Sequence, residues 1–461
     1  RYPCWFNQEL INCICQRKYF HRKFKQYKTQ YFLNKFKFFR SLCKVLTINA
    51  HKYYIDNIQA QISNDPKKFW SYVQNKRGRS RIPSSMKYEN SELTSPVDIV
   101  NGFSTFFSSV YIASNPNSPF QFTGQEISNL IVAVSHISED EILHVLKTFK
   151  DSFTSGTDMI PSFLLKDCAY VFAKPLFYIF NLILTSSVFP DVWKRASITP
   201  IFKEGDITCV ENYRPICLLC NFAKVFESVL YKRIYSSIKC YITPLQHGFV
   251  EKRSTVTNLA SFSQYASEAI DNKNQIDVVY TDFSKAFDQI DHYILLKKLE
   301  CFGFTKPLLS LMELYLIGRN LSVKYNNFVS NSFSPTSGVP QGSNLGPLLF
   351  LIFINDVVDV IASNKLLFAD DLKLFLEVKS LSDCVKLQND VNILSNWGYN
   401  NRLCLNKEKC YIVTYSRKEI NIIYNYSIEG KHLVRLDRFK DLGVIFDNKF
   451  YFTHHISDCI S

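Results

Sequence analysis

Three carboxylates in this sequence have neighbours that suggest chemistry. Asp370 and Asp371 are adjacent in an apolar run, LLFADDLKLF (366–375), and Asp282 follows a β-rich run that ends at Thr281. A charged side chain is usually excluded from an apolar interior unless a partner compensates it. Carboxylates that converge on one point repel each other unless a cation sits between them, and hard ions such as Mg²⁺ suit oxygen ligands and phosphates. Two such ions about 4 Å apart can hold the attacking and leaving oxygens of a phosphoryl transfer.

The elements around these residues must position them. After the aspartates, Leu372, Leu374 and Leu376 alternate with more polar or aromatic residues, a period of two that predicts a β-hairpin. The Asp pair would occupy its tight turn, exposed at the end of a sheet. Because Asp is a common turn former, a plain hairpin turn is the favoured interpretation of the pair taken alone.

The segment QIDVVYTDFSKAFDQIDH (275–292) predicts a strand followed by a helix. The strand would cover Ile276 to Tyr280, with Asp282 at its end and Ser284 as the cap of the helix. A carboxylate at a strand end and another on a neighbouring hairpin could together form the two-metal clamp.

Two further segments could bind a nucleotide. The glycines of SGVPQGSNLGPLLFLIFINDV (337–357) would let the backbone approach a flat ligand, and Gln341 could reach a base or sugar. Lys203 in ITPIFKEGD and Arg214 in ENYRPI could hold a triphosphate. An ordinary glycine-rich loop and two surface charges are the simpler interpretations of each segment in isolation.

Two shorter segments predict helices. Val97 to Tyr111 is a short helix candidate, and SEDEILHVLKTFK (138–150) begins with a capping box formed by Ser138 and Glu141.

Charge is distributed unevenly along the chain. The 461 residues exceed one ordinary core and carry a net charge of +13. Residues 1–81 alone contain 18 Lys and Arg against 3 Asp and Glu, a net charge of +15, interleaved with aromatic residues in a pattern of long helices. Such a segment suggests a polyanion partner, either nucleic acid or an anionic membrane surface, although a solvated helical face would have the same composition.

The cysteines and the apolar segments favour an intracellular protein. Fourteen cysteines are scattered, and the Cys217–Cys220 pair has no second pair nearby to complete a zinc site. No secretory signal is visible, and the apolar stretch 169–189 contains Lys174 and Pro175, which favours a buried helix over a membrane span. The chain begins with Arg1, which suggests an internal piece of a longer protein.

Eight motifs in order give the sequence its family resemblance: SGTDMIPSFLLK, ITPIFKEGD with NYRPI, QHGFVEKRST, YTDFSKAFDQIDH, SGVPQGSNLGPLLF, FADD, LCLNKEKC and FKDLGVIFD. Together they resemble the reverse transcriptase of non-LTR retrotransposons, the jockey-like and LINE-like group, over about residues 155–456. The resemblance implies an α+β right-hand polymerase with fingers, palm and thumb. The resemblance divides the chain into five expected parts. Residues 1–114 would form a basic helical connector and 115–136 a linker. The fingers and the start of the palm would span 137–275 and the palm with the catalytic motifs 276–416, while 417–461 would contain the end of the palm, the primer-grip region and the start of a truncated thumb.

The resemblance also implies roles for individual residues. Two Mg²⁺ ions, with Mn²⁺ as an alternative, would be bound by Asp282, Asp370, Asp371 and the backbone carbonyl of Phe283. Nucleotide-binding residues would be Lys203, Arg214, Phe287 as an aromatic steric gate, Gln341, Gly342, and Lys409 beside the departing pyrophosphate. The segment from Asp441 to Val444 would grip the primer end. Nucleic acid would contact the basic N-terminal residues Lys23, Lys25, Arg40, Lys67, Lys68 and Arg77.

The implied activity is RNA-directed DNA polymerisation with an RNA template, a DNA primer or target and dNTPs, without a membrane. An endonuclease domain is expected in the full-length parent, and the expected location is the nucleus and a cytoplasmic ribonucleoprotein. Two departures from the family pattern, Val250 and Asn344, do not touch the metal ligands. A catalytically inactive RNA-binding relic and an RNA polymerase on the same palm are the alternatives; the intact aspartates argue against the first and Phe287 against the second.

Overall fold

The computed structural model describes residues 5–61, 82–89, 91–113 and 130–460. The chain forms two compact units, Arg1–Arg81 and Ile82–Ser461. Residues 82–113, which the sequence analysis grouped with the basic N-terminal region, therefore pack within the second unit. Lys67, Lys68, Arg77 and most of the expected linker (114–129) lie outside the described residues.

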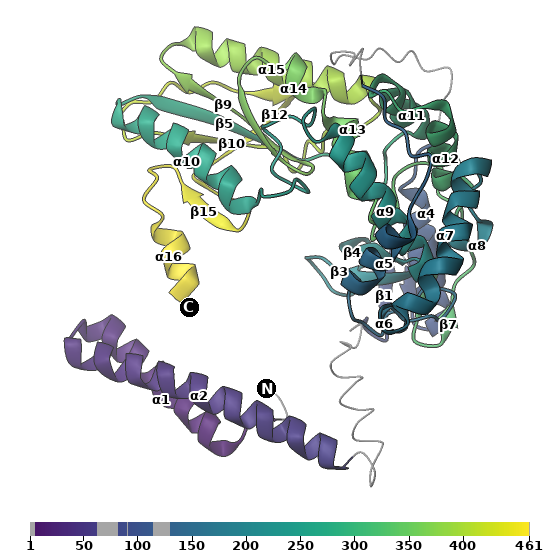
Figure 1. Cartoon of the computed structure of the whole chain (residues 1–461). Helices are drawn as coiled ribbons and strands as arrows, with labels where there is room; N and C mark the ends of the chain where they lie inside the picture. Colours follow the sequence, from purple (N-terminus) through teal and green to yellow (C-terminus); the bar gives the residue numbers. More distant parts are fainter. Residues whose placement is uncertain (1–4, 62–81, 90, 114–129, 461) are drawn as a thin grey trace. The chain divides into compact units, whose positions relative to one another are not determined.

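The N-terminal unit is a helical hairpin of α1 (Gln8–Tyr27) and α2 (Gln30–Gln61) (Figure 1). Lys28 ends α1 in a left-handed conformation, with φ of 50°. The helices pack through aromatic and thiol side chains: Phe20 stacks on Phe39 at 5.3 Å, and the buried sulfurs of Cys13 and Cys43 lie 3.1 Å apart. Residues 8–27 and 30–61 are thus two long helices.

The second unit mixes helices and strands, as an α+β fold predicts. Its five-stranded sheet has the order β13-β10-β5-β9-β8. β5 (Gln275–Thr281) lies at the centre and pairs antiparallel with both β9 (Asp371–Val378) and β10 (Tyr411–Tyr415). β8 (Asn364–Phe368) is antiparallel to β9, and β13 (Val434–Leu436) is parallel to β10.

Helices cover both faces of this sheet (Figure 1). On one face, Leu372 and Leu374 join a large core with α15 (Leu381–Asn400) and α13 (Gly346–Ile354). On the other face, Phe375 joins a second core with α10 (Thr255–Asp271), β14 (Arg438–Asp441) and β15 (Val444–Asp447). The predicted period of two is therefore confirmed, but both sides of β9 are covered by protein.

A four-stranded sheet lies in the other half of the second unit. Its order is β4-β3-β6-β7, with β3 (Arg195–Phe202) antiparallel to β4 (Tyr213–Leu218) and parallel to β6 (Asn320–Tyr325). Helix α4 (Pro96–Ser109), predicted for about 97–111, packs on this sheet through Phe103 and Phe107. Further elements of the second unit are β1 (Met86–Tyr88), β2 (Ser91–Leu93), α6 (Ser162–Asp167), α8 (Asp191–Lys194), η1 (Val210–Asn212), α11 (His292–Cys301), α12 (Lys306–Leu316), β7 (Phe328–Val329), α14 (Val357–Val360), β11 (Ser427–Ile428), β12 (Lys431–His432) and α16 (Thr453–Ile460).

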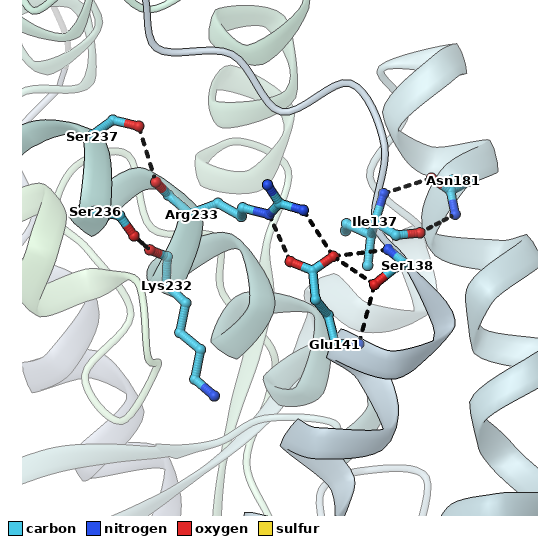
Figure 2. A network of polar contacts seen from close by, with 8 residues as sticks. All are labelled: Ile137, Ser138, Glu141, Asn181, Lys232, Arg233, Ser236 and Ser237. Carbon is cyan, nitrogen blue, oxygen red and sulfur yellow. Dashed lines mark hydrogen bonds and ion pairs between the residues drawn. The ribbon is translucent and has the colours of Figure 1, made fainter.

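Polar contacts tie three helices of this region together (Figure 2). Ser138 and Glu141 form the predicted capping box of α5 (Glu139–Thr148). Glu141 also accepts two bonds from Arg233 of α9 (Asn221–Ile238), at 2.6 and 2.9 Å. The Arg233 side chain lowers the pKa of Glu141 to about 2, so this ion pair persists across the ordinary pH range. Asn181 of α7 (Ala169–Ser186) binds both backbone groups of Ile137.

Helix α7 is long and apolar enough to cross a membrane by length and composition alone. Its buried residues form one face that enters the large core, among them Leu176, Phe180 and Ile183. Tyr170, Val171 and Leu182 are exposed on another face. The helix is therefore packed along one side, and a third of its 18 residues are buried.

Candidate active site

The turn between β8 and β9 carries the adjacent aspartates. Phe368 pairs with Asp371, so the turn consists of Ala369 and Asp370. The predicted hairpin is confirmed, but the expectation that both aspartates occupy its turn is wrong, because Asp371 is the first residue of β9. Ala369 has a left-handed backbone, with φ of 57°. Asp370 is half-buried and Asp371 is exposed, as expected for a turn at the end of a sheet.

Asp282 follows β5 directly and lies beside the same hairpin. Thr281 pairs with Leu372, so Asp282 and Asp371 extend from neighbouring strands at one end of the sheet. The backbone carbonyl of Asp282 accepts a hydrogen bond from the Asn406 N–H at 2.7 Å. The sheet therefore brings the three predicted catalytic carboxylates into one region.

The prediction of a helix directly after Asp282 is wrong. Residues 283–291 form a bridge and turns, and α11 begins only at His292 with Asp291 as its cap. The N–H of Ser284, the expected cap, donates instead to the Cys404 carbonyl at 2.9 Å. A segment from far along the chain thus takes the backbone bonds that a helix would need, and Phe283 bridges to Leu405 in this arrangement.

The three carboxylates disfavour one another's charged forms. Asp371 keeps contact with solvent at the end of the sheet, but the protein atoms around its carboxyl partly desolvate it and raise its pKa to about 7. The charges of Asp370 and Asp282 contribute to this increase. Burial also raises the pKa of Asp282, and Asp370 adds to that increase. The pKa of Asp370 is raised by burial too, although Arg214 and Lys203 oppose the increase. Their mutual repulsion marks the region as one that a cation would stabilise.

The donor set fits a hard divalent ion by its chemistry, because it consists of carboxylate oxygens. Among the residues that the structure describes, no three His, Cys, Asp or Glu side chains converge as a ready-made ligand set. A bound cation would therefore draw Asp282, Asp370 and Asp371 closer together, and the raised pKa values supply the electrostatic reason for such a change.

An open cleft of about 480 Å³ lies next to the carboxylates. Asp282 and Asp371 line it together with the predicted cations Lys203, Arg214 and Lys409. Lys203 follows β3, Arg214 lies on β4, and Lys409 precedes β10, so residues from both sheets meet here. The arrangement of acidic and basic groups suits a ligand that bridges metal ions and cations, as a triphosphate does.

Glu204, which the sequence analysis did not single out, lies between two of these cations. Its Oε1 is 3.8 Å from Lys203 Nζ and 3.5 Å from Lys409 Nζ. All three side chains are well exposed, so these pairs contribute little to stability. They do place the two lysines on the same side of the cleft.

Gln341, Gly342 and Phe287, three of the predicted nucleotide-binding residues, do not line this cleft. Gln341 donates a hydrogen bond from Nε2 to the buried Asp288 at 2.8 Å. Gly342 has φ of 104° and leaves no room for a side chain, since a Cβ there would lie 2.8 Å from the Cys217 carbonyl oxygen. Phe287 is half-buried and stacks on Phe350 at 4.6 Å.

The region expected to grip the primer end borders the cleft. Asp441 and Leu442 line it at the tip of the β14–β15 hairpin. Phe439 of β14 stacks on Tyr280 of β5 at 4.0 Å, which fixes the hairpin to the central strand. Lys373 of β9 forms a buried ion pair with Asp441, a contact that spacing along the sequence could not reveal.

The described basic residues of the N-terminal unit lie on its two helices. Lys23 and Lys25 are on α1 and Arg40 is on α2. Lys23 lies over the rings of Tyr19 and Tyr27, at 6.0 and 5.2 Å. Their binding to nucleic acid stays a prediction.

Comparison with known proteins agrees with this geometry. Residues 201–446, just over half of the chain, match the family described as reverse transcriptase (RNA-dependent DNA polymerase). The matched range contains all three carboxylates and all the predicted nucleotide-binding residues.

Several curated proteins are similar to the chain. It is 29% identical over 356 residues to the RNA-directed DNA polymerase from mobile element jockey of Drosophila melanogaster, which covers 74% of this chain and 37% of that protein. The jockey polymerase of Drosophila funebris is 28% identical, with 76% and 38% covered. The Pol polyprotein of the type-2 retrotransposable element R2DM of Drosophila melanogaster is 27% identical, with 58% and 26% covered.

The chain thus spans little more than a third of the length of the two jockey proteins. The family match implies the right-hand polymerase fold, and the mixture of helices with mainly antiparallel sheets is consistent with it. The carboxylates at one end of the five-stranded sheet, the cations that line the same cleft and the match over residues 201–446 agree, and the chain belongs to the reverse transcriptase family, within which it is similar to the jockey-like polymerases of non-LTR retrotransposons.

Proposed function

We propose that the chain is the polymerase part of a non-LTR retrotransposon protein and extends a primer 3′ hydroxyl with dNTPs on an RNA template. The observation that carries this proposal is the cleft. Carboxylates from adjacent strands line it together with Lys203, Arg214 and Lys409, within the region that matches the family.

In this proposal Asp282 and Asp370 bind two divalent ions, with Asp371 and the backbone carbonyl of Phe283 completing the site. When bound, the Mg²⁺ ions would stabilise the attacking and leaving oxygens of an in-line phosphoryl transfer. Lys203 and Arg214 orient the triphosphate of the incoming nucleotide. In the free chain Lys409 pairs with Glu204; when it leaves this partner, its ammonium group binds the departing pyrophosphate.

The remaining residues set the identity of the substrate. Gln341 and Gly342 border the nucleotide and template, and the ring of Phe287 excludes a ribose 2′ hydroxyl. The basic N-terminal unit adds affinity for nucleic acid. An endonuclease in the parent protein would supply the primer by cutting the DNA target.

Substitution of the proposed metal ligands tests the reaction. Asp282→Asn and Asp370→Asn each remove a charge and keep the size of the side chain. Each should reduce dNTP incorporation on a primed RNA homopolymer at least about 1,000-fold, which corresponds to about 4 kcal/mol of barrier. Affinity for the RNA, measured by fluorescence anisotropy, should stay nearly unchanged.

Asp271→Asn provides a matched control. Asp271 is an exposed aspartate at the end of α10, away from the cleft lining, so the same chemical change there should leave incorporation unaffected. Wild-type chain that binds primed RNA but incorporates no dNTP with Mg²⁺ or Mn²⁺ would contradict the proposal and support the inactive RNA-binding relic.

A further inference from the structure

The turn that carries Asp370 needs support from outside the hairpin. Ala369 occupies the left-handed region, which a residue with a Cβ rarely adopts. Small changes in this residue would redirect both following carboxylates, because Asp370 and Asp371 come directly after it. The surroundings of Ala369 therefore decide how well the two aspartates are oriented.

The side chain of Gln246 binds both backbone groups of Ala369. The Ala369 N–H donates to Gln246 Oε1 at 2.8 Å, and Gln246 Nε2 donates to the Ala369 carbonyl at 3.2 Å. The same Oε1 accepts the Gly248 N–H at 2.8 Å. Gln246 is only 1% exposed, so these bonds do not compete with water.

The backbone around Gln246 is aligned with β8. The Leu367 N–H donates to the Leu245 carbonyl at 3.0 Å, and the His247 N–H donates to the Leu367 carbonyl at 2.9 Å. Gln246 and Leu367 form a parallel bridge. These contacts hold the segment against the strand that leads into the turn.

Gly248 completes the fit. A Cβ at this position would lie 2.2 Å from the backbone nitrogen of Ala369, closer than any real contact. The glycine thus allows the segment to approach the turn closely enough for the carboxamide of Gln246 to reach it. The sequence QHGF, one of the motifs behind the family resemblance, acquires a physical reason here.

We propose that Gln246 is a positioning residue that holds the Ala369–Asp370 turn in the orientation that binds the divalent ion. The inference rests on the proposed function, since it assumes a metal site at Asp282, Asp370 and Asp371. Gln246 acts through Ala369 and does not touch substrate or metal itself. Groups that orient metal ligands in this way change metal affinity about 10- to 100-fold when they are substituted.

The alternative is that Gln246 is only a buried amide of the core, and Gln275 provides a matched control. Gln275 is also 1% exposed and binds both backbone groups of one residue, Ile422, at 2.8 Å each. It lies at the opposite end of β5 from Asp282. Gln275 Nε2 also donates to the buried Asp277 Oδ1 at 2.9 Å, so each glutamine makes three buried hydrogen bonds. Gln246→Met and Gln275→Met therefore remove the same number of bonds at different distances from the carboxylates.

The test measures Mn²⁺ binding to the intact chain by electron paramagnetic resonance, without nucleic acid, together with thermal unfolding. Asp370→Asn defines the background from other sites. Gln246→Met should weaken the specific Mn²⁺ binding at least about 10-fold, whereas Gln275→Met should change it less than about twofold. If either methionine variant does not fold, Gln246→Asn and Gln275→Asn repeat the comparison, because the shorter amide cannot span the same distance.

Equal Mn²⁺ affinities for the wild type and a folded Gln246 variant would overturn the inference, as would a wild-type signal no greater than that of Asp370→Asn. Failure of the proposed function gives a different pattern. In that case the wild type binds Mn²⁺ and depends on Gln246 for it, but incorporates no dNTP.

Discussion

Lys373 and Asp441 form an ion pair inside the protein, with only 4% and 8% of their side chains exposed. Lys373 is two residues beyond Asp371 on β9, and Asp441 ends β14. The Lys373 ammonium also lies 4.9 Å from the centre of the Phe262 ring, beneath the sheet. This pair connects the catalytic hairpin to the hairpin expected to grip the primer.

Breaking this pair should destabilise the protein strongly. Asp441→Leu leaves the Lys373 ammonium without its buried counter-charge, which costs about 3–5 kcal/mol of unfolding free energy. The double variant Lys373→Met/Asp441→Leu should recover most of the loss, because apolar side chains of similar volume can replace a buried pair. Urea unfolding of the wild type, Asp441→Leu and the double variant measures the effect, and a double variant as unstable as Asp441→Leu would contradict it.

Dependence of stability on pH should reveal the repulsion at the metal site. The pKa of Asp371 is about 7 in the folded chain, above its ordinary value of 3.8. The folded state therefore holds a proton that the unfolded chain releases. The stability that this carboxyl contributes is complete below the ordinary pKa and is lost as the pH rises to about 7.

Asp371→Asn removes this titration and tests the assignment. Without divalent ions, the wild type should lose more stability than Asp371→Asn between about pH 5 and pH 8. Mg²⁺ should raise the melting temperature of the wild type more at pH 8 than at pH 6, because the ligand must be deprotonated. Asp288, with a pKa of about 6, contributes equally to both proteins. Parallel pH curves for the two proteins would contradict the assignment.

Local patterns predicted the β8–β9 hairpin, helix α4 and the capping box of α5, because each depends on residues close together in the sequence. Through the family resemblance, the motifs predicted that Asp282 and Asp371 meet the cations Lys203, Arg214 and Lys409 in the cleft. The other predicted nucleotide-binding residues, Gln341, Gly342 and Phe287, do not line it. Ser284 shows the limit of local reasoning. It has a capping residue's chemistry, but its N–H pairs with Cys404, far along the chain.

Other contacts at the site could not be predicted from the sequence, because they join segments that are far apart along the chain. Gln246 binds Ala369 and Lys373 binds Asp441, and neither pair has a spacing that a sequence reveals. Asn344, which departs from the family pattern, donates from its side chain to the Lys224 carbonyl at 3.0 Å and to Ser228 at 2.7 Å. The departure is thus compensated by polar contacts with α9, since the amide can bond where an aliphatic residue could only pack.

The basic N-terminal unit should make nucleic-acid binding dependent on salt. Neutralising Lys23, Lys25 and Arg40 to Gln should reduce the slope of log affinity against log salt by about 2, the value for three contacts with single-stranded phosphates. The equivalent change at the exposed Lys232, Lys239 and Lys252 of the second unit should leave the slope unchanged. The measurement is RNA binding by fluorescence anisotropy across a KCl series, and equal slopes for all three proteins would contradict the prediction.

Phe287 should select dNTPs over rNTPs. Its ring lies between Phe350, stacked at 4.6 Å, and Phe249, edge-on at 5.9 Å, in the turn segment that follows Asp282. These contacts hold the ring rigidly, and a rigid wall resists even a small added volume such as a 2′ hydroxyl, at a cost of about 1–3 kcal/mol. Phe287→Val should therefore keep much of its dNTP activity and improve its relative use of rNTPs about 5- to 100-fold.

The alternative is that Phe287, which is half-buried, serves only to pack the core. Phe287 packs against the large core, so Phe287→Val also removes an aromatic pair worth about 0.5–1.5 kcal/mol of stability. Phe350→Leu removes the same stacking from the core side and serves as the matched control. If both variants lose stability and both activities together, with an unchanged ratio of dNTP to rNTP incorporation, Phe287 is a core residue, and the RNA polymerase alternative becomes open again. If only Phe287→Val changes the ratio, the ring acts on the sugar, because the loss of stacking is common to both variants.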